Sequence, residues 1–240
     1  RSNLDPSFTV NVGEKGNSTG TAFSIRDDGI WFTARHVVDG CDRVGLQVDQ
    51  RRAAKVQKVQ SHPKADIAVL WTRGGKPGIA IASAPLRVNQ PGYHVGYPEG
   101  KPGQVVSSLI GRRNMRTVGR YRHTEPVVAW VERARHPVTQ SLGGLSGGPA
   151  FNAAGEIIGV TVAASKRRGR VFTTAPATMN DMLSLAKIQP AGLPSGGLRI
   201  RPNSREYVQY GEKLRGELIV AKVLCLVDRP SRRRSGWRGY

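Results

Sequence analysis

The sequence lacks several features that would point to particular classes of protein. Among its 240 residues it has only two cysteines, Cys41 and Cys225, and no CxxC pair. No metal-ligand spacing occurs around either cysteine, so neither a bound metal nor a cofactor is expected. No window approaches the roughly 18 consecutive apolar residues of a transmembrane helix, so no membrane span is expected. With two isolated cysteines, one disulfide and two buried thiols both remain open.

Acidic residues are scarce relative to basic ones. The chain has 17 Asp and Glu against 37 Lys and Arg, a formal net charge of +20. Such a field attracts nucleic acid, anionic lipid or acidic protein. The densest basic runs, at residues 166–170 and 232–234, contain no aromatic residues, and aromatics make up 6% of the chain. Solvated surface is therefore favoured over a nucleic-acid site, and an acidic partner stays open.

Regular helical periodicity is also scarce, and short apolar segments separated by Gly, Pro and Asn turns dominate up to about residue 174. This pattern predicts an all-β fold, a sandwich or a barrel. One helix is predicted over residues 179–187, with Thr178 as its cap and Asp181 three places on, and Pro190 ends it. After that, residues 191–197 have the composition of a linker. Residues 218–227 form an apolar segment that predicts a docked strand, and 231–240 favour disorder.

One loop, residues 140–151, places Ser146 among four glycines. Glycines let a backbone adopt positive φ, so that several N–H groups can point at one spot beside an exposed hydroxyl. A nucleophile with an oxyanion hole needs that geometry. A glycine-rich hairpin whose serine forms only local hydrogen bonds is the alternative.

The same loop contains G-x-S-x-G, the nucleophile elbow of α/β-hydrolases. Their triad places the histidine after the serine. All five histidines of this chain precede Ser146, so that interpretation fails. A His…Asp…Ser order remains possible.

Three segments together resemble the trypsin-like (chymotrypsin-fold) serine proteases, in particular their bacterial HtrA-like branch. They are Thr-Ala-Arg-His ending at His36, Asp-Ile-Ala-Val-Leu beginning at Asp66, and Gly-Leu-Ser-Gly-Gly-Pro around Ser146. They occur in the family's order over roughly residues 8–187. The resemblance implies two antiparallel six-stranded β-barrels with one short C-terminal helix and a basic extension. It also implies hydrolysis of peptide bonds in a protein or peptide substrate.

The resemblance assigns a role to each matching residue. Ser146 would be the nucleophile, His36 the general base and then acid, and Asp66 the residue that orients the imidazole. The backbone N–H groups of Gly144 and Ser146 would form the oxyanion hole. Three other acids compete with Asp66 but lie in turn-like polar contexts: Asp39, Asp42 and Asp49. The remaining histidines are expected to be surface or core residues.

The resemblance also divides the chain. A protease domain is expected over residues 5–190, with a first barrel at about 5–88, a second at about 92–178 and the helix at 179–187. Residues 191–240 form a basic extension, which is too short for the PDZ domain of many HtrA-type members. Leu145 replaces the Asp that digestive members carry before the nucleophile, so activation through a new N-terminal amine is not expected.

In this family the residue six before the nucleophile sets the floor of the substrate pocket, here Gln140. The strand after Gly159 supplies the wall, with Thr161, Val162, Ala163 and Ala164 at the relevant places. With no carboxylate among these residues, a substrate Arg or Lys would bury an unpaired charge. Cleavage after uncharged residues of small to middling size is expected. The run at 166–168 is expected to favour acidic residues elsewhere in the substrate.

The family often braces its histidine loop, which Cys41 follows, and Cys225 lies in the only apolar segment of the extension. A Cys41–Cys225 disulfide is therefore expected, and with it a periplasmic or secreted location. The chain begins with Arg1 rather than Met, consistent with removal of a leader. Two other functions remain open: a catalytically silent scaffold with the protease fold, and a basic protein that binds nucleic acid or a surface.

Overall fold

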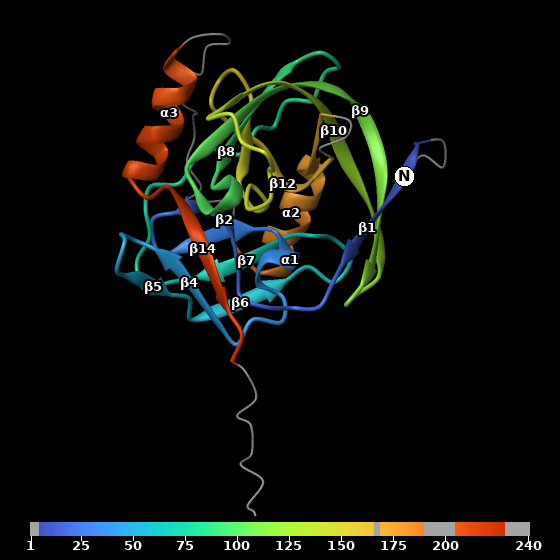
Figure 1. Ribbon diagram of the computed structural model, residues 1–240. Helices are drawn as coiled ribbons and strands as arrows, with labels where there is room; N and C mark the ends of the chain where they lie inside the picture. Colours follow the sequence, from blue (N-terminus) through green and yellow to red (C-terminus); the bar gives the residue numbers. More distant parts are fainter. Residues whose placement is uncertain (1–4, 166–168, 190–204, 229–240) are drawn as a thin grey trace, which may run out of the picture.

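The computed structural model describes residues 5–165, 169–189 and 205–228. They form two β-sheets, one above the other in Figure 1, and the predicted all-β architecture is confirmed. None of the helices in these residues is long and apolar enough to cross a membrane. The basic runs at 166–168 and 232–234, the predicted linker and the segment 231–240 lie outside the described residues.

The second sheet contains the strands of the later half of the chain. They are β8 (Pro91–Gly96), β9 (Gly103–Gly119), β10 (His123–His136), β11 (Pro149–Phe151), β12 (Ile157–Ser165) and β13 (Arg170–Thr174). The order is β9-β10-β13-β12-β11-β8, and β8 pairs again with β9. Six strands thus close into a barrel, with Trp130 and Ile158 buried in its core.

The first sheet runs β5-β4-β14-β2-β3-β7-β6. Its strands are β2 (Ser18–Arg26), β3 (Ile30–Thr33), β4 (Arg43–Gln47), β5 (Ala53–Lys55), β6 (Lys58–Ser61), β7 (Ala68–Trp71) and β14 (Val220–Leu226). The edge strands β5 and β6 are halves of one segment. Between them, the N–H of Val56 bonds the Val44 carbonyl and that of Gln57 the Trp71 carbonyl, on strands from opposite ends of the sheet. The sheet therefore curls until its two edges meet.

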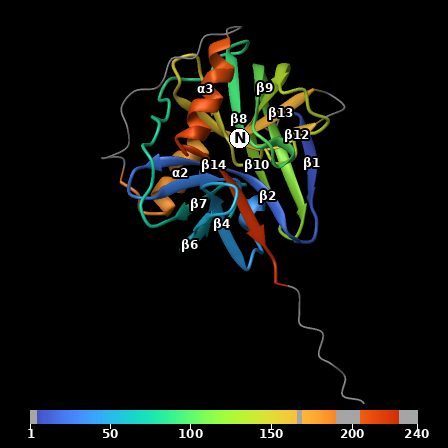
Figure 2. The same ribbon diagram turned by 60° about the vertical axis from the view of Figure 1, so that its left-hand side comes forward.

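The first strand of the chain belongs to the second sheet, and the last strand belongs to the first sheet. β1 (Ser7–Val12) runs parallel to β9 on the second sheet, not within a first barrel spanning 5–88. Its apolar side chains account for this position, because Phe8 stacks on Phe172 of β13 with ring centroids 4.2 Å apart. β14 inserts between β2 and β4. β14, which lies in the expected extension, is therefore an integral strand of the first sheet, as Figure 2 shows.

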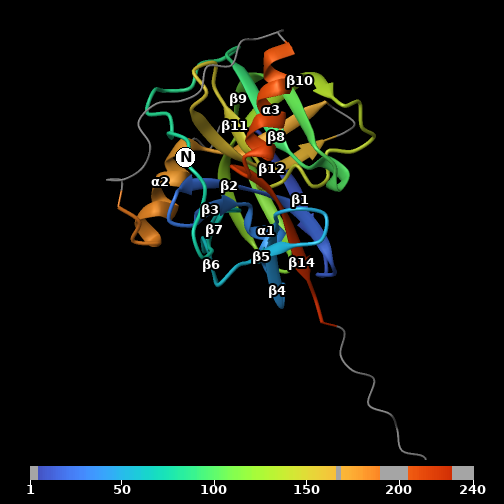
Figure 3. The same cartoon turned by 90° about the vertical axis from the view of Figure 1, so that its left-hand side faces the viewer.

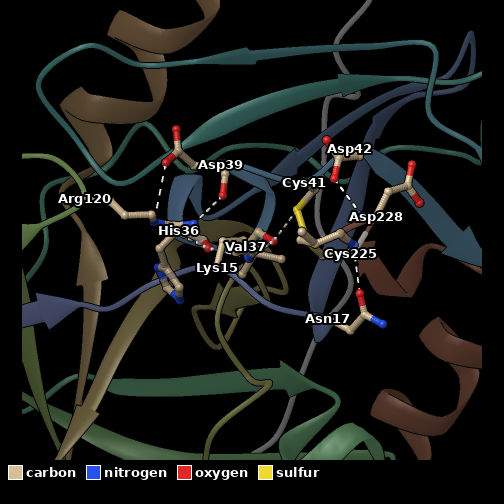
Figure 4. The surroundings of a disulfide bond; sticks show 11 residues. Lys15, Asn17, His36, Val37, Asp39, Cys41, Asp42, Arg120, Cys225 and Asp228 are labelled. Atoms are coloured by element: carbon tan, nitrogen blue, oxygen red, sulfur yellow. Dashed lines mark hydrogen bonds and ion pairs between the residues drawn. A yellow bond between two sulfur atoms is a disulfide. The ribbon is translucent and has the colours of Figure 1, made fainter. Parts of the chain in front are cut away.

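A disulfide fixes β14 in this place. Cys225 is paired with Cys41, with their Cα atoms 5.5 Å apart, and Cys225 is buried. Figure 4 shows this bond close to the segment that carries His36. Next to it, the N–H of Val227 bonds Asn17 Oδ1 at 2.8 Å and that of Asp228 bonds Asp42 Oδ2 at 2.7 Å. The predicted cysteine pair is present in the structure.

The helices differ from the sequence prediction. The predicted helix is α2 (Pro176–Leu185), which begins before Thr178 because Pro176 occupies its first position, where a fixed φ and a missing N–H are favourable. Thr178 is a buried residue inside this helix, so its role as a cap was wrong. Two short helices, α1 (Arg35–Val38) and the 3-10 turn η1 (Pro98–Gly100), were not predicted.

A further helix, α3 (Arg205–Gly216), precedes β14 and was not predicted either. It lies beside β8 in Figure 3. The buried Arg215 docks it, donating to the carbonyl of Gly103 and to Gln104 Oε1 at 3.2 and 2.8 Å. These bonds satisfy the buried guanidinium.

Candidate active site

His36 lies on α1, the single helical turn that follows β3. Two cations hold the carbonyl end of this turn, as Figure 4 shows. Lys15 Nζ donates to the carbonyls of His36 and Val37 at 3.1 and 2.9 Å, and Arg120 donates to the carbonyl of Asp39 at 2.6 Å. Burial and the charge of Arg120 lower the pKa of Lys15 to about 8. The main chain of His36 is thus fixed from the solvent side of the turn.

Asp66 accepts two hydrogen bonds from His36. Its Oδ2 lies 2.6 Å from His36 Nδ1, and its Oδ1 accepts from the His36 backbone N–H at 2.8 Å. Asp66 is 3% exposed, whereas the His36 side chain is 26% exposed. Burial acts to raise the pKa of Asp66, but the charge and hydrogen bonds of His36 outweigh it and the pKa is lowered. An ionised Asp66 bonded to Nδ1–H leaves Nε2 as the free nitrogen of the ring.

The loop that carries Ser146 is anchored to both sheets. The Ser146 carbonyl accepts from the Thr21 N–H at 2.8 Å, and the Gly144 carbonyl accepts from Thr21 Oγ1 at 2.7 Å. The carbonyl of Gly143 accepts from the N–H of Glu99 on η1. Gly144 has φ +96°, and a Cβ there would collide with the Tyr97 carbonyl oxygen. The glycines thus allow the loop to approach η1 closely.

His36, Gly144 and Ser146 line one cleft of about 560 Å³ between the two sheets. His36 comes from the first sheet, and Ser146 from the loop that precedes β11 of the second. The same cleft is bordered by residues 10–19 and by Val162, Ala163 and Ala164 of β12. A partly exposed imidazole and a serine in one cleft, with the imidazole bonded to a buried carboxylate, are the parts of a nucleophilic site.

Comparison with known proteins agrees with this geometry. Residues 20–160 match the model of the trypsin-like peptidase domain. The chain belongs to the trypsin-like peptidase family.

This trypsin-like peptidase is 32% identical over 215 residues to a "probable periplasmic serine endoprotease DegP-like" of Halomonas elongata. The match covers 86% of this chain and 44% of the relative, so the chain spans less than half of that protein. Its fold resembles the Rv3671c protease of M. tuberculosis in its active form (TM-score 0.59, 22% identity, 73% of this chain and 74% of that one). It also resembles an HtrA-type protease, AlgW, solved with a decapeptide (TM-score 0.56, 22% identity, 70% and 51%).

The competing acids of the peptidase have other partners. Asp39 lies 3.7 Å from Arg35 and 3.8 Å from Arg120. Asp42 accepts from the N–H of Asp228, and Asp49 from the N–H groups of its own turn. Of these four carboxylates, only Asp66 forms a hydrogen bond with the His36 ring.

The residues expected to form a substrate pocket divide into two groups. Gln140 and Ala164 line a cavity of about 210 Å³ beside Ser146. Thr161 is 1% exposed and lies with its Oγ1 3.3 Å from Nδ1 of the buried His94, so it does not line that cavity. Val162 and Ala163 border the larger cleft instead.

Arg135 also lines the cavity beside Ser146, and sequence reasoning missed it. Its guanidinium forms two bonds of 2.5 Å with the Glu132 carboxylate and donates to the Thr139 carbonyl at 2.9 Å. The hydrogen bonds and charge of Glu132 raise the pKa of Arg135. A cation with its own counter-ion therefore forms part of the pocket wall.

Asp66 has neighbours from β10 and from the turn before it that sequence reasoning also missed. Tyr121 Oη donates to Asp66 Oδ1 at 3.4 Å, and the N–H of Asp66 donates to Glu125 Oε1 at 2.8 Å. His123 Nε2 lies 2.9 Å from the same Glu125 oxygen. The only sequence signal was a histidine and a glutamate two residues apart, a spacing that is common in any chain.

Proposed function

We propose that this chain is a serine endopeptidase that hydrolyses protein substrates through His36, Asp66 and Ser146. The single observation that carries the proposal is the 2.6 Å contact of His36 Nδ1 with the buried Asp66 carboxylate, in the cleft that Ser146 also lines. It is supported by membership in the trypsin-like peptidase family.

In this mechanism, Nε2 of His36 takes the proton of Ser146 Oγ as that oxygen attacks the scissile carbonyl carbon. The carbonyl oxygen becomes an oxyanion and is stabilised by the backbone N–H groups of Gly144 and Ser146. His36 then gives the proton to the leaving amine, and water releases the acyl group by the same steps in reverse. Asp66 stabilises the imidazolium throughout. The Gly143 carbonyl accepts from the N–H of Glu99 and the Leu145 carbonyl from the N–H of Gly148. These bonds turn the N–H groups of Gly144 and Ser146 the opposite way, which supports a formed oxyanion hole.

A fluorophosphonate probe and a protein substrate test the proposal together. The wild type should be labelled at Ser146 and should digest an unfolded protein, and Ser146→Ala should lose both properties. Ser184→Ala, at an exposed serine on α2, is the matched control and should keep both. A wild type that binds protein or DNA but is never labelled would instead identify a scaffold or a basic binding protein.

The cavity beside Ser146 is proposed as the pocket for the residue that precedes the cut. Gln140 and Ala164 line it without a carboxylate, and the nearby Glu132 is already paired with Arg135, so a substrate Arg or Lys would find no free partner. Because Glu132 neutralises Arg135, a substrate carboxylate has no free cation to pair with. Uncharged residues such as Ala, Val, Ser or Leu are therefore proposed at this position.

A periplasmic or secreted location is proposed for the enzyme. The Cys41–Cys225 disulfide supports it, because such bonds persist in oxidising compartments. The name of the Halomonas elongata relative, which calls that protein periplasmic, agrees with it.

A further inference from the structure

The main chain of Asp66 is held by a second, buried acid. Its N–H donates to Glu125 Oε1 at 2.8 Å, and Glu125 lies on β10 of the other sheet. Glu125 is 1% exposed. The same oxygen lies 2.9 Å from Nε2 of His123, whose side chain is 5% exposed. A buried carboxylate–imidazole pair on the second sheet therefore contacts the proposed catalytic acid of the first.

This pair is not fully satisfied. Among the described residues, Glu125 Oε2 and His123 Nδ1 are buried without a hydrogen-bond partner. A buried carboxyl with an unpaired oxygen is costly, and apolar side chains of similar volume are often as stable in its place. Stability alone therefore gives no reason to keep a glutamate here. Costly buried ionisable groups concentrate at functional sites.

A neighbouring aromatic residue ties the pair to the Asp66 side chain. The Tyr121 ring stacks on that of His123 with an interplanar angle of 4°, and its hydroxyl donates to Asp66 Oδ1. The Arg35 guanidinium lies 3.9 Å from the centroid of the Tyr121 ring. Asp66 is thus held at its carboxylate by His36 and Tyr121 and at its N–H by Glu125. The N–H contact fixes the main chain from which the carboxylate extends.

We infer that Glu125 is a positioning residue for the proposed triad. Its Oε1 holds the Asp66 main chain in the position from which the carboxylate accepts the hydrogen bond of His36 Nδ1. The inference rests on the proposed function, since it assigns Glu125 an effect on the same reaction. What matters is an acceptor at the place of Oε1. A negative charge is not required there.

The groups around Glu125 agree with a role that needs its hydrogen-bond acceptor but not its negative charge. Burial raises its pKa, with the His123 hydrogen bond opposing and the Asp66 charge adding to the effect. Asp66 and His123 are its direct titratable neighbours. His36, Arg35 and His62 surround those two. A negative charge is thus disfavoured at a position where the acceptor is used.

Three substitutions of Glu125 test the inference. Glu125→Met removes the acceptor but keeps the length, Glu125→Asp keeps the charge but is one methylene too short, and Glu125→Gln keeps an acceptor without the charge. Thr124→Ala, at an exposed position of the same strand, is the control. The readouts are kcat per fluorophosphonate-labelled site, KM, the melting temperature, and the low-field NMR signal of the His36 Nδ1 proton.

Misplacement of a catalytic group by about 1 Å can cost on the order of 100-fold in rate. Glu125→Met and Glu125→Asp should therefore lose about 10- to 100-fold in kcat with little change in KM, and the His36 proton signal should shift or broaden. Glu125→Gln should stay within about threefold of the wild type and keep the signal, like the control.

Wild-type kcat per labelled site in Glu125→Met and Glu125→Asp would overturn the inference, whatever their melting temperatures. So would a Glu125→Gln variant as slow as Glu125→Met. If neither of the first two folds, Glu125→Gln decides alone: retained kcat and signal support the inference, and loss overturns it. A wild type that is never labelled at Ser146 contradicts the proposed function instead, and so is distinguishable.

Discussion

At the scale of single residues, the acid of the proposed triad is tested by removing one charge. Asp66→Asn should lower kcat about 10⁴-fold, because the amide favours the wrong tautomer of His36. Activity assays with a peptide substrate measure this loss of kcat. Asp39→Asn removes a nearby carboxylate that pairs with Arg35 and Arg120, and it should keep most of the activity. The reverse outcome would move the acid to Asp39.

Glu125 should make stability depend on pH in a defined direction. Its pKa is raised on folding from an ordinary value of 4.5, so the folded state holds the proton more tightly than the unfolded state. The stability this contributes is present below about pH 4.5 and is lost as pH rises through the folded pKa. Glu125→Gln should therefore gain stability relative to the wild type between pH 4 and pH 7. Urea unfolding at both pH values measures the difference, and a difference that does not change with pH would contradict the shift.

Arg135 should control which residue precedes the cut. A peptide library should show cleavage after Ala, Val, Ser or Leu and little after Arg or Lys. Arg135→Met leaves the Glu132 carboxylate without its cation, so relative kcat/KM after Lys should rise about tenfold, equivalent to about 1.4 kcal/mol. The double variant Arg135→Met/Glu132→Gln is the control and should lose that gain. Dominant cleavage after Arg or Lys in the wild type would overturn the pocket assignment.

Sequence reasoning could identify residues in short motifs but not residues that meet only through the fold. His36, Asp66 and Ser146 each lie in a recognisable string, and the structure brings the first two into contact. Tyr121 and Glu125 contact Asp66 from positions 55 and 59 residues away, in the β9–β10 turn and on β10 of the other sheet. No local pattern encodes that separation. Arg135 was missed for a similar reason, because its place in the pocket depends on how the loop after β10 folds back.

At the scale of elements, the groove between β1 and β12 should favour acidic substrates. This cavity of about 530 Å³ is lined by Phe8 and Val10 and by two cations, Arg113 and Arg170. It shares Val10, Ala163 and Ala164 with the cleft of Ser146, so a bound peptide can extend into it. A preference for acidic substrate residues was first expected from residues 166–168, which lie outside the described residues. It can be tested instead on Arg113 and Arg170.

Replacing Arg113 and Arg170 together with Gln should lower kcat/KM for a peptide with Glu on the amino side of the cut. The expected loss is about two- to fivefold, equivalent to about 0.4–1 kcal/mol, because exposed charge pairs are weak. It should shrink in high salt. Arg116→Gln, on the same strand but outside the cavity, is the control. Equal losses for the matching Gln peptide would show that charge is not recognised.

The elements themselves were predictable where short apolar runs are bounded by turn residues, as in β2, β3 and β12. The segment 53–60 contains two strands, because it bends at Val56 and Gln57 to pair with different neighbours. α3 was missed because Gly211 and several charged residues obscure its apolar face. Partner choice and the docking of a helix are tertiary effects that override local propensity.

At the scale of the whole molecule, the disulfide should stabilise the closure of the first sheet. The bond joins residues 184 apart, and cross-links across loops of this size typically contribute about 2–5 kcal/mol. The double variant Cys41→Ala/Cys225→Ala should lose about that much free energy of unfolding, measured by urea titration. Mass spectrometry of the non-reduced, alkylated protein checks the pairing. Two free thiols would contradict it, as would unchanged stability in the double variant.

The exchange of β1 and β14 between the sheets has a consequence for synthesis. A gap remains between β2 and β4 until β14 occupies it, so the barrel that carries His36 and Asp66 cannot close while its last strand is still in the ribosome. Long-range pairing of this kind also makes folding slow. A nascent chain would thus hold its proposed nucleophile, Ser146, while its acid and base are still unassembled. The topology would delay proteolytic competence, and with it any attack on neighbouring nascent chains, until β14 has left the ribosome.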